Sequence, residues 1–402
     1  MGELVKEGIL EAPLDGNHGE KHPTSDEYVD SGIPFLMASD IHNGEVNIYS
    51  CKYITKERAE RLDKGFARNG DVLLTHKATI GETAILSNLM TEYAMLTPQV
   101  TYYRIKNEER LNREYLYSFF NSLDFQTELK TKAAQSTRPY IGITAQQNLK
   151  IILPAEIDEQ IRIGLYFRNL DHLITLHQRK CDQTKNLKKY MLQKMFPQNG
   201  AKVPEIRFDG YTYDWEQRRF GEITELKSAS RVHKDEWTSN GVPFYRSSDV
   251  MTAINGTENE KAFISEELYE KLSKVSGKLE EGDILVTGGG SVGNPYIVPD
   301  NKPLYTKDAD LLWIKNKGKF HPYFLYEFFF SPTFRNYLGS ISHVGTIAHY
   351  TITQLSDTPI GLPIFEEQKE VGEYFQSLDR LITLHQRQTD FYKKISFYYI
   401  SS

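Results

Sequence analysis

The amino-acid sequence predicts an α+β fold with two tandem globular domains, each followed by a long helix. First, the chain repeats itself at an offset of about 209 residues. Solenoid repeats are only roughly 20–50 residues long, so this offset indicates two copies of a whole domain. Second, each copy passes from short strand and turn signals into a long stretch with apolar residues at helical spacing. With 402 residues, of which 39% are hydrophobic, the chain can bury two cores.

The composition excludes several classes of protein. Lys and Arg number 48 against 54 Asp and Glu, and this balance argues against a protein that coats nucleic acid by bulk charge. A local basic face on an acidic protein stays compatible with DNA binding. Two cysteines are too few for a secreted disulfide scaffold and favour a reducing cytoplasm. Neither a signal peptide nor a run of 18 apolar residues is visible, so we expect no membrane segment.

The duplication is defined by four pairs of matching segments. They are 32–41 (GIPFLMASDI) with 241–250 (GVPFYRSSDV), 69–85 (NGDVLLTHKATIGETAI) with 281–297 (EGDILVTGGGSVGNPYI), 115–125 (YLYSFFNSLDF) with 324–334 (FLYEFFFSPTF), and 170–179 (LDHLITLHQR) with 378–387 (LDRLITLHQR). The last pair is nearly identical, whereas the globular parts differ at most positions. We therefore expect the shared part to do a common job and the divergent parts to act on different targets.

The globular part of the first copy carries strand and helix signals. Strands are predicted over Asp71–Thr75 after an Asn-Gly turn, over Gln99–Ile105, and over Leu149–Leu153 before a proline. Helices are predicted over Lys56–Leu62 and Arg113–Leu129. The aligned Asp40 and Asp249 are expected to cap the turn after a strand.

The long helix of the first copy is predicted from about Asp158 to Phe196. Apolar residues recur at three- and four-residue spacing, and no proline occurs before Pro197. About 39 helical residues would span ~58 Å at 1.5 Å per residue. The second copy supplies a similar stretch from about Glu366, so we expect the two helices to pair as a coiled-coil-like spacer. The first helix is basic, and either a solvated face or a surface for a polyanion or acidic partner explains this charge.

In combination, these motifs resemble the specificity subunit of a type I restriction–modification system. Residues 153–180 and 185–198 resemble the helical repeat of that family, and 203–224 resemble the start of its second target-recognition domain. The first copy lacks a counterpart of Pro204–Trp215, so we expect its first strand to be abbreviated. The resemblance implies two target-recognition domains separated by two long antiparallel coiled-coil helices. The expected segments are target-recognition domain 1 over 1–154, the central helix over 155–198, target-recognition domain 2 over 199–363 and the C-terminal helix over 364–402.

The resemblance also implies a function without chemistry in this chain. Each target-recognition domain would read one half of an asymmetric, bipartite site in double-stranded DNA. A spacer of ~58 Å is longer than one turn of DNA, about 34–36 Å, and would set the gap between half-sites. The helices would dock adenine-methyltransferase subunits, two of them expected, and restriction/translocase subunits would join the assembly. No catalytic residue, cofactor or metal is expected, and the implied location is the cytoplasm.

Two groups of residues are candidates for binding. The partner-binding candidates on the helices are Leu170, Leu173, Ile174, Leu187, Met191, Leu378, Leu381 and Ile382. Base readout needs polar side chains that reach groove edges, and two polar, turn-rich loops per copy could supply them. The DNA-binding candidates are Thr75, His76, Lys77, Thr79, Gln135, Ser136, Thr137, Arg138, Tyr140, Arg246, Thr287, Gly289, Ser291, His343, Thr346 and His349. For each of them an ordinary solvated loop is the alternative.

Signals for other functions are weaker. Residues 288–293 (GGGSVG) match the glycine pattern of a dinucleotide site, but residues 294–299 (NPYIVP) cannot readily start the helix that such a site needs. Neither Cys51 nor Cys181 has a cysteine counterpart in the other copy, which argues against a metal site. Two alternatives stay open: a coiled-coil scaffold that presents two protein-binding modules without a DNA role, and a nucleotide-dependent enzyme that uses the Gly288–Gly293 loop.

Overall fold

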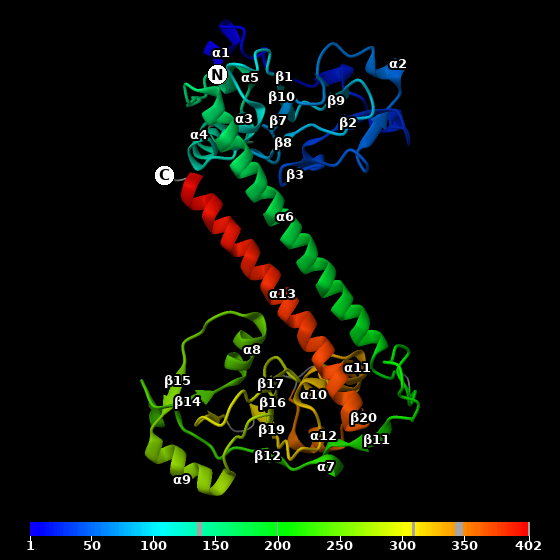
Figure 1. The fold of residues 1–402 in the computed structure, drawn as a ribbon, viewed down its shortest axis with the longest axis vertical. Helices are drawn as coiled ribbons and strands as arrows, with labels where there is room; N and C mark the ends of the chain where they lie inside the picture. The colour runs from blue at the N-terminus through cyan, green and yellow to red at the C-terminus, as the bar shows by residue number, and fades with distance from the viewer. Residues whose placement is uncertain (135–138, 199, 308–309, 342–348, 401–402) are drawn as a thin grey trace. The chain divides into compact units, whose positions relative to one another are not determined.

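The computed structural model describes residues 1–134, 139–198, 200–307, 310–341 and 349–400, without the side chains of 397–400. The chain divides into two compact units. Unit 1 contains Met1–Lys180 and His385–Ser402, and unit 2 contains Cys181–Leu384. Each unit therefore combines one globular part with a stretch of each long helix (Figure 1).

Unit 1 is built on two four-stranded sheets. The first has the order β1 (Leu14–Asp15), β10 (Val100–Tyr103), β7 (Val72–Thr75), β8 (Thr83–Ile85), with every pair antiparallel. The second has the order β5 (Lys52–Ile54), β2 (Ile33–Leu36), β9 (Ala94–Leu96), β6 (Phe66–Ala67), with β2 and β9 parallel. A short hairpin pairs β3 (Ile41–His42) with β4 (Glu45–Val46).

The helices of unit 1 divide between its two sheets: Phe120 and Phe125 pack with residues of the first sheet, whereas Ala59 packs with residues of the second. The α-helices of its globular part are α1 (Gly2–Lys6), α2 (Lys56–Ala59), α3 (Arg113–Phe120), α4 (Leu123–Ala133) and α5 (Ile143–Gln147). Val72 and Leu74 of β7 join Phe120 and Phe125 in one hydrophobic core, while Leu73 joins a second core. Successive side chains of a strand point to opposite faces, so β7 is buried on both faces between two cores.

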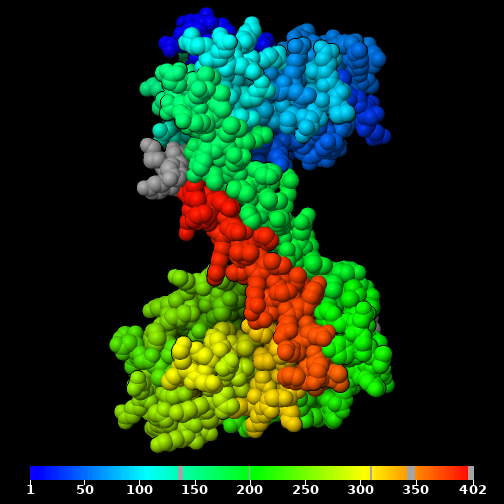
Figure 2. Space-filling view, viewed as in Figure 1, coloured from blue at the N-terminus to red at the C-terminus, as the bar shows by residue number. Residues whose placement is uncertain are grey.

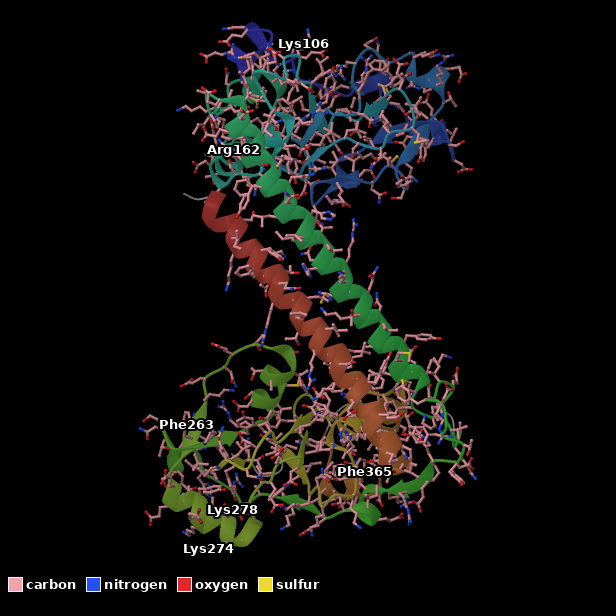
Figure 3. All side chains as sticks on the ribbon, in the orientation of Figure 1. Lys106, Arg162, Phe263, Lys274, Lys278 and Phe365 are labelled. Carbon is pink, nitrogen blue, oxygen red and sulfur yellow. The ribbon has the colours of Figure 1, made fainter. Side chains whose placement is uncertain are left out.

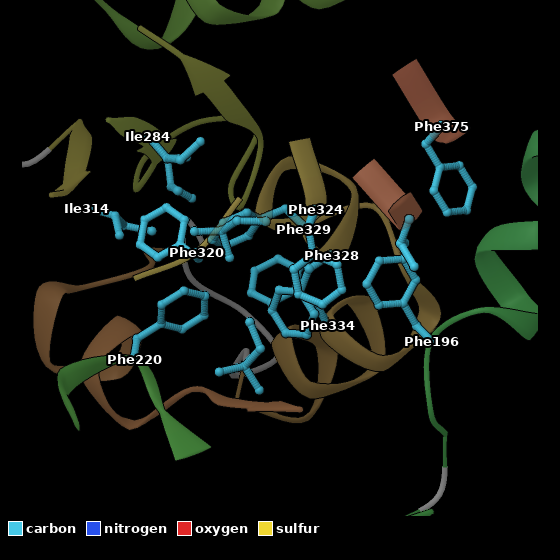
Figure 4. Close-up of a cluster of buried hydrophobic side chains, with 14 of the residues drawn as sticks. Phe196, Phe220, Ile284, Ile314, Phe320, Phe324, Phe328, Phe329, Phe334 and Phe375 are labelled. Carbon is cyan, nitrogen blue, oxygen red and sulfur yellow. The ribbon is translucent and has the colours of Figure 1, made fainter. Parts of the chain in front are cut away.

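Unit 2 repeats this arrangement. Its first sheet has the order β12 (Leu226–Ser228), β19 (Leu311–Ile314), β16 (Ile284–Thr287), β17 (Pro295–Ile297). Its second has the order β13 (Trp237–Thr238), β15 (Ala262–Ile264), β14 (Val242–Tyr245), β18 (Tyr305–Thr306), with β14 and β18 parallel. The α-helices of its globular part are α7 (Phe220–Ile223), α8 (Ser247–Asn255), α9 (Glu266–Ser276), α10 (Pro322–Phe328), α11 (Pro332–Ile341) and α12 (Ile352–Asp357). Figure 4 shows its phenylalanine-rich core, to which Phe196 and Phe375 also belong.

The two long helices are α6 (Ile157–Lys194, 38 residues) and α13 (Phe365–Ile400, 36 residues). In unit 2, Cys181 lies against Ile382 while Lys188 bonds to Asp379, so α6 and α13 are antiparallel there. In unit 1 the two helices also meet, and the Nδ1 atoms of His177 and His385 are 3.0 Å apart. These helices and the two similar globular parts confirm the predicted fold class. In the described part of the chain, no helix has the length and hydropathy of a membrane span.

Several local predictions are confirmed and three are corrected. Strands form as predicted within Asp71–Thr75 and Gln99–Ile105. The helix expected over Arg113–Leu129 is instead two helices, because the Ser122 side chain accepts the backbone N–H of Phe125 and starts α4. The helix predicted over Lys56–Leu62 ends at Ala59.

The strand predicted over Leu149–Leu153 is wrong, since these residues pair with no strand in the described chain. A strand needs a neighbour for its backbone N–H and C=O groups. In unit 2 the equivalent strand, β20 (Pro359–Leu362), pairs with β11 (Glu216–Arg219). At the offset of about 209 residues, the counterpart of β11 is residues 7–10, and these residues do not pair with Leu149–Leu153.

Candidate nucleic-acid interface

The first predicted loop of each copy lies between two strands of the first sheet. We name them the β7–β8 loop (residues 76–82) and the β16–β17 loop (residues 288–294). The Thr75 hydroxyl accepts the Glu82 N–H at 2.9 Å, and its carbonyl accepts the Gly81 N–H at 2.9 Å. In unit 2 the Thr287 hydroxyl accepts the Asn294 N–H at 2.9 Å, and its carbonyl accepts the Gly293 N–H at 2.7 Å. One threonine therefore closes each loop in the same way.

These threonines were predicted as DNA contacts. Both are fully buried, and their hydroxyls bond to the loop backbone. Each side chain thus shapes its loop from beneath. The exposed residues of the two loops include Lys77 and Thr79 in unit 1 and Ser291 in unit 2.

The two predicted loops of unit 1 meet at Lys77 and Tyr140. These residues form an isolated antiparallel β-bridge, and the Lys77 ammonium lies 6.0 Å from the centroid of the Tyr140 ring. The Ile141 N–H donates to the carbonyl of His76 at 3.2 Å. An exposed cation and an exposed aromatic ring therefore lie side by side, where a phosphate can pair with the cation.

His76 supports this contact from below. Its ring is buried and lies 5.6 Å from the Tyr140 ring, and its Nδ1 is 2.7 Å from the Thr101 hydroxyl. Burial lowers the pKa of His76 to about 4, against the opposing effect of Asp15. The ring is therefore neutral near pH 7 and adds no charge to the surface.

The two predicted loops of unit 2 also meet. The Tyr350 N–H donates to the Gly288 carbonyl at 2.8 Å, and the Gly288 N–H donates to the backbone carbonyl of Asp310 at 2.8 Å. A Cβ placed on Gly289 would lie 3.9 Å from Nδ1 of the exposed His349. The duplicated positions therefore carry Lys77 and Tyr140 in unit 1, and Gly289 and His349 in unit 2.

Arg246 is held by its own unit. Its Nε donates to Asp249 at 2.9 Å and its Nη2 donates to the Glu260 carbonyl at 2.6 Å. The backbone N–H of Arg246 also donates to Asp249, and Asp40 accepts the N–H of Met37 in the same way, which confirms the predicted caps. The remaining DNA-binding candidates, Gln135, Ser136, Thr137, Arg138, His343 and Thr346, lie outside the described residues.

The partner-binding candidates differ in burial. Leu170 and Leu378 are buried, while Leu173, Ile174, Met191 and Ile382 are half-buried. Leu187 and Leu381 are each 44% exposed and offer apolar surface on the helices. The exposed side chains of α13 form part of the surface in Figure 2.

Two signals for other functions can now be placed. The β16–β17 loop leads into strand β17, so it offers no helix N-terminus to a pyrophosphate. Among the described residues, no group of three or more His, Cys, Asp or Glu side chains could hold a metal ion. The sequence reasoning missed Gln126 and Arg335, which contact the two loops from helices α4 and α11. The sequence gives one hint of their role: Gln126 and Arg335 occupy equivalent positions, directly after the matching segments 115–125 and 324–334.

Known proteins share this architecture. A family model described as the type I restriction modification DNA specificity domain matches twice, over residues 8–186 and 213–390. The type I restriction enzyme MjaVIII specificity subunit from Methanocaldococcus jannaschii is 23% identical over 380 residues, which cover 91% of this chain and 83% of that protein. A putative type I restriction enzyme specificity subunit from Haemophilus influenzae is 26% identical over 170 residues, 40% of each chain.

A solved structure has the same fold. The crystal structure of the type I restriction–modification system S subunit from M. genitalium has a TM-score of 0.62 and 13% identity, covering 97% of this chain and 92% of that one. The two family matches cover most of the sequence, one in each copy of the duplication. The chain therefore belongs to the family of type I restriction–modification specificity subunits and carries two DNA specificity domains.

Proposed function

We propose that this specificity subunit reads an asymmetric, bipartite sequence in double-stranded DNA, one half with each globular part. The observation that carries the proposal is the repeated loop construction. Both units close the first loop with a buried threonine and set the second loop beside it. The exposed side chains on this common frame differ between the units. A shared frame with different side chains supports two readers of different sequences.

The long helices support a fixed gap between the two half-sites. At 1.5 Å per residue the 38 residues of α6 span about 57 Å, more than the 34–36 Å of one DNA turn. The proposed segments are target-recognition domains over 1–154 and 199–363, and spacer helices over 155–198 and 364–402. The exposed Leu187 and Leu381 suit a helical docking surface for adenine-methyltransferase subunits, two in the proposed complex.

The chemistry in this proposal belongs to the partners. The methyltransferase subunits modify adenine, restriction/translocase subunits join them, and this chain supplies specificity. The proposed DNA target places the assembly in the cytoplasm. The relatives are themselves named specificity subunits of restriction enzymes, which supports this division of labour.

A long-read map of methylated adenine in the source cells, with and without this gene, tests the proposal. We expect one asymmetric, split motif to lose its methylation when the gene is removed. If purified complex with its methyltransferase subunits neither binds nor methylates DNA, the scaffold without a DNA role becomes the better explanation.

A further inference from the structure

Each first loop lies directly on a helix of its own unit. Gly81 has φ +99°, and a Cβ there would come within 2.3 Å of the Gln126 side chain. The aligned Gly293 has φ +76°, and a Cβ there would come within 2.8 Å of Leu338 and 2.9 Å of Phe334. A side chain at either position would be strained and would clash. The glycines therefore allow the loops to contact α4 and α11 closely.

In unit 1 the contact is made by Gln126 of α4. Its Nε2 donates to the Gly81 carbonyl at 2.8 Å and to the Phe120 carbonyl at 2.7 Å. One neutral amide thus joins the β7–β8 loop to the end of α3. The loop position is set by a half-buried side chain from a different element.

In unit 2 the equivalent residue is Arg335 of α11. Its guanidinium donates to the Val292 carbonyl at 3.3 Å and to the Asn294 side chain at 3.0 Å. The same group lies 5.4 Å from the ring centroid of Phe330 and 5.7 Å from that of Phe334. Burial lowers the pKa of Arg335, but an arginine keeps its proton in proteins. The β16–β17 loop is therefore fixed at two points by a planar cation held over aromatic rings.

We propose that Gln126 and Arg335 are positioning residues that determine base specificity, each for one half of the DNA site. The inference rests on the proposed function, because it concerns the loops that we expect to face DNA. A loop held in one conformation presents its tip to the groove without an ordering cost on binding, whereas a released loop samples many conformations. Releasing one loop should therefore relax base preference in one half-site and leave the other half unchanged.

The test uses the full-length subunit with its methyltransferase partner and long-read mapping of methylated adenine. Arg335→Met and Gln126→Met remove the hydrogen bonds and keep side chains of similar length. We expect each variant to reduce base discrimination about tenfold in one half of the split motif, with the two variants affecting opposite halves. Arg335→Gln places at this position the amide donor that unit 1 has in Gln126, so it should keep most of the base discrimination that Arg335→Met loses. Arg335→Lys keeps the charge without the planar donor pair, and serves if Arg335→Met does not accumulate.

Three results would overturn the inference. The first is an unchanged motif combined with a lower melting temperature, as a purely structural role predicts. The second is relaxation of the same half by both variants. The third is a wild-type subunit that directs no split motif at all, which would reject the proposed function together with this inference. The inference is supported if the wild-type subunit directs a split motif and the two variants relax base preference in opposite halves of it.

Discussion

The two units differ at the place where the long helices meet the globular part. In unit 2, Lys188 of α6 lies 2.8 Å from Glu327 of α10 and 2.7 Å from both carboxylate oxygens of Asp379 on α13. Glu327 is fully buried and Lys188 mostly so. One ammonium thus joins two helices to the domain through a buried cluster, which we call the ion cluster. Its carboxyl group Glu327 keeps a proton up to about pH 8, because burial raises its pKa.

Unit 1 has a polar cavity at the equivalent place. The duplication aligns Lys188 with Ser396, Glu327 with Ser118 and Asp379 with Asp171. A cavity of about 300 Å³ opens there, and its lining includes all three of these unit 1 residues together with Tyr117 and Lys393. The Tyr117 hydroxyl donates to Asp171 at 2.9 Å, and burial raises the pKa of that carboxyl.

The aligned residues show which side chains changed together at this junction. The pair of Lys and Glu corresponds to a pair of Ser, so an ammonium and a carboxyl group are exchanged for two hydroxyls together. Exchanging only the Lys would leave Glu327 and Asp379 without their cation, at a cost of several kcal/mol. Both solutions occur beside a first sheet with the corresponding strand order, β1-β10-β7-β8 in unit 1 and β12-β19-β16-β17 in unit 2.

The largest effect is expected from removing the ammonium of unit 2. Lys188→Met leaves Glu327 and Asp379 without their cation, and we expect unit 2 to lose about 3–5 kcal/mol of unfolding free energy. Chemical unfolding, followed with hydrogen exchange to localise the loss, measures this. The exposed Lys185→Met on the same helix is the matched control, with an expected change below about 0.5 kcal/mol. Equal losses in both variants would contradict an ion cluster at this junction.

Building the ion cluster into unit 1 tests whether the two junctions are equivalent. Ser118→Glu alone places a carboxylate beside Asp171 and should destabilise unit 1. Adding Ser396→Lys should restore stability, with a coupling free energy of about 2 kcal/mol. A double-mutant cycle of unfolding free energies measures the coupling. Coupling near zero would show that the cavity and the ion cluster are not equivalent places.

The pH dependence of unit 2 should report the same cluster. Burial raises the pKa of Glu327 to about 8, although Lys188 opposes this shift. The folded state then keeps a proton that the unfolded state releases from about pH 4.5 upwards, so stability falls as pH rises from about 4.5 to 8. The slope is at most about 1.4 kcal/mol per pH unit. Glu327→Gln should remove this slope, and urea unfolding at pH 6 and pH 8 compares the two proteins.

The sequence predicted the elements that depend on local pattern. The strand predicted over Asp71–Thr75 from its Asn-Gly turn and apolar run forms as β7. The structure adds that the repeated Gly-Asp motif ends in a buried carboxylate in both units: Asp71 accepts the Arg68 N–H and Arg104, and Asp283 accepts Trp313 and Asn316. The polar loops were found for the same reason, since their composition is local.

The sequence did not show what depends on distant partners. Gln126 meets Gly81 across 45 residues, and Lys188 meets Glu327 across 139. No spacing rule relates such pairs. Thr75 looked available to DNA because its loop is polar, but its place at the end of a buried strand turns the hydroxyl inward. The strand expected over Leu149–Leu153 failed similarly, for want of a neighbour.

The smallest effect concerns the first loops, where the exposed Lys77 of unit 1 corresponds to the buried Gly289 of unit 2. If Lys77 pairs with a phosphate, Lys77→Ala should weaken DNA binding by the assembled complex and reduce the slope of log K against log salt by about 1. Lys106→Ala is the control. Lys106 is exposed (Figure 3) and lies beyond Tyr103, the last residue of β10. The loop that carries Lys77 begins after Thr75, which pairs with Val100 at the opposite end of β10.

The converse change is Gly289→Lys in unit 2. A Cβ there meets Asp310 at 3.4 Å and His349 at 3.9 Å, both ordinary contacts, so the lysine should be tolerated. It should raise the salt slope by about 1, because the repeated frame puts this position where Lys77 stands in unit 1. Salt titrations of DNA binding measure both variants. A slope that falls with Lys77→Ala and does not rise with Gly289→Lys would mean that the two first loops face DNA differently. The two units would then share a scaffold without sharing a docking geometry.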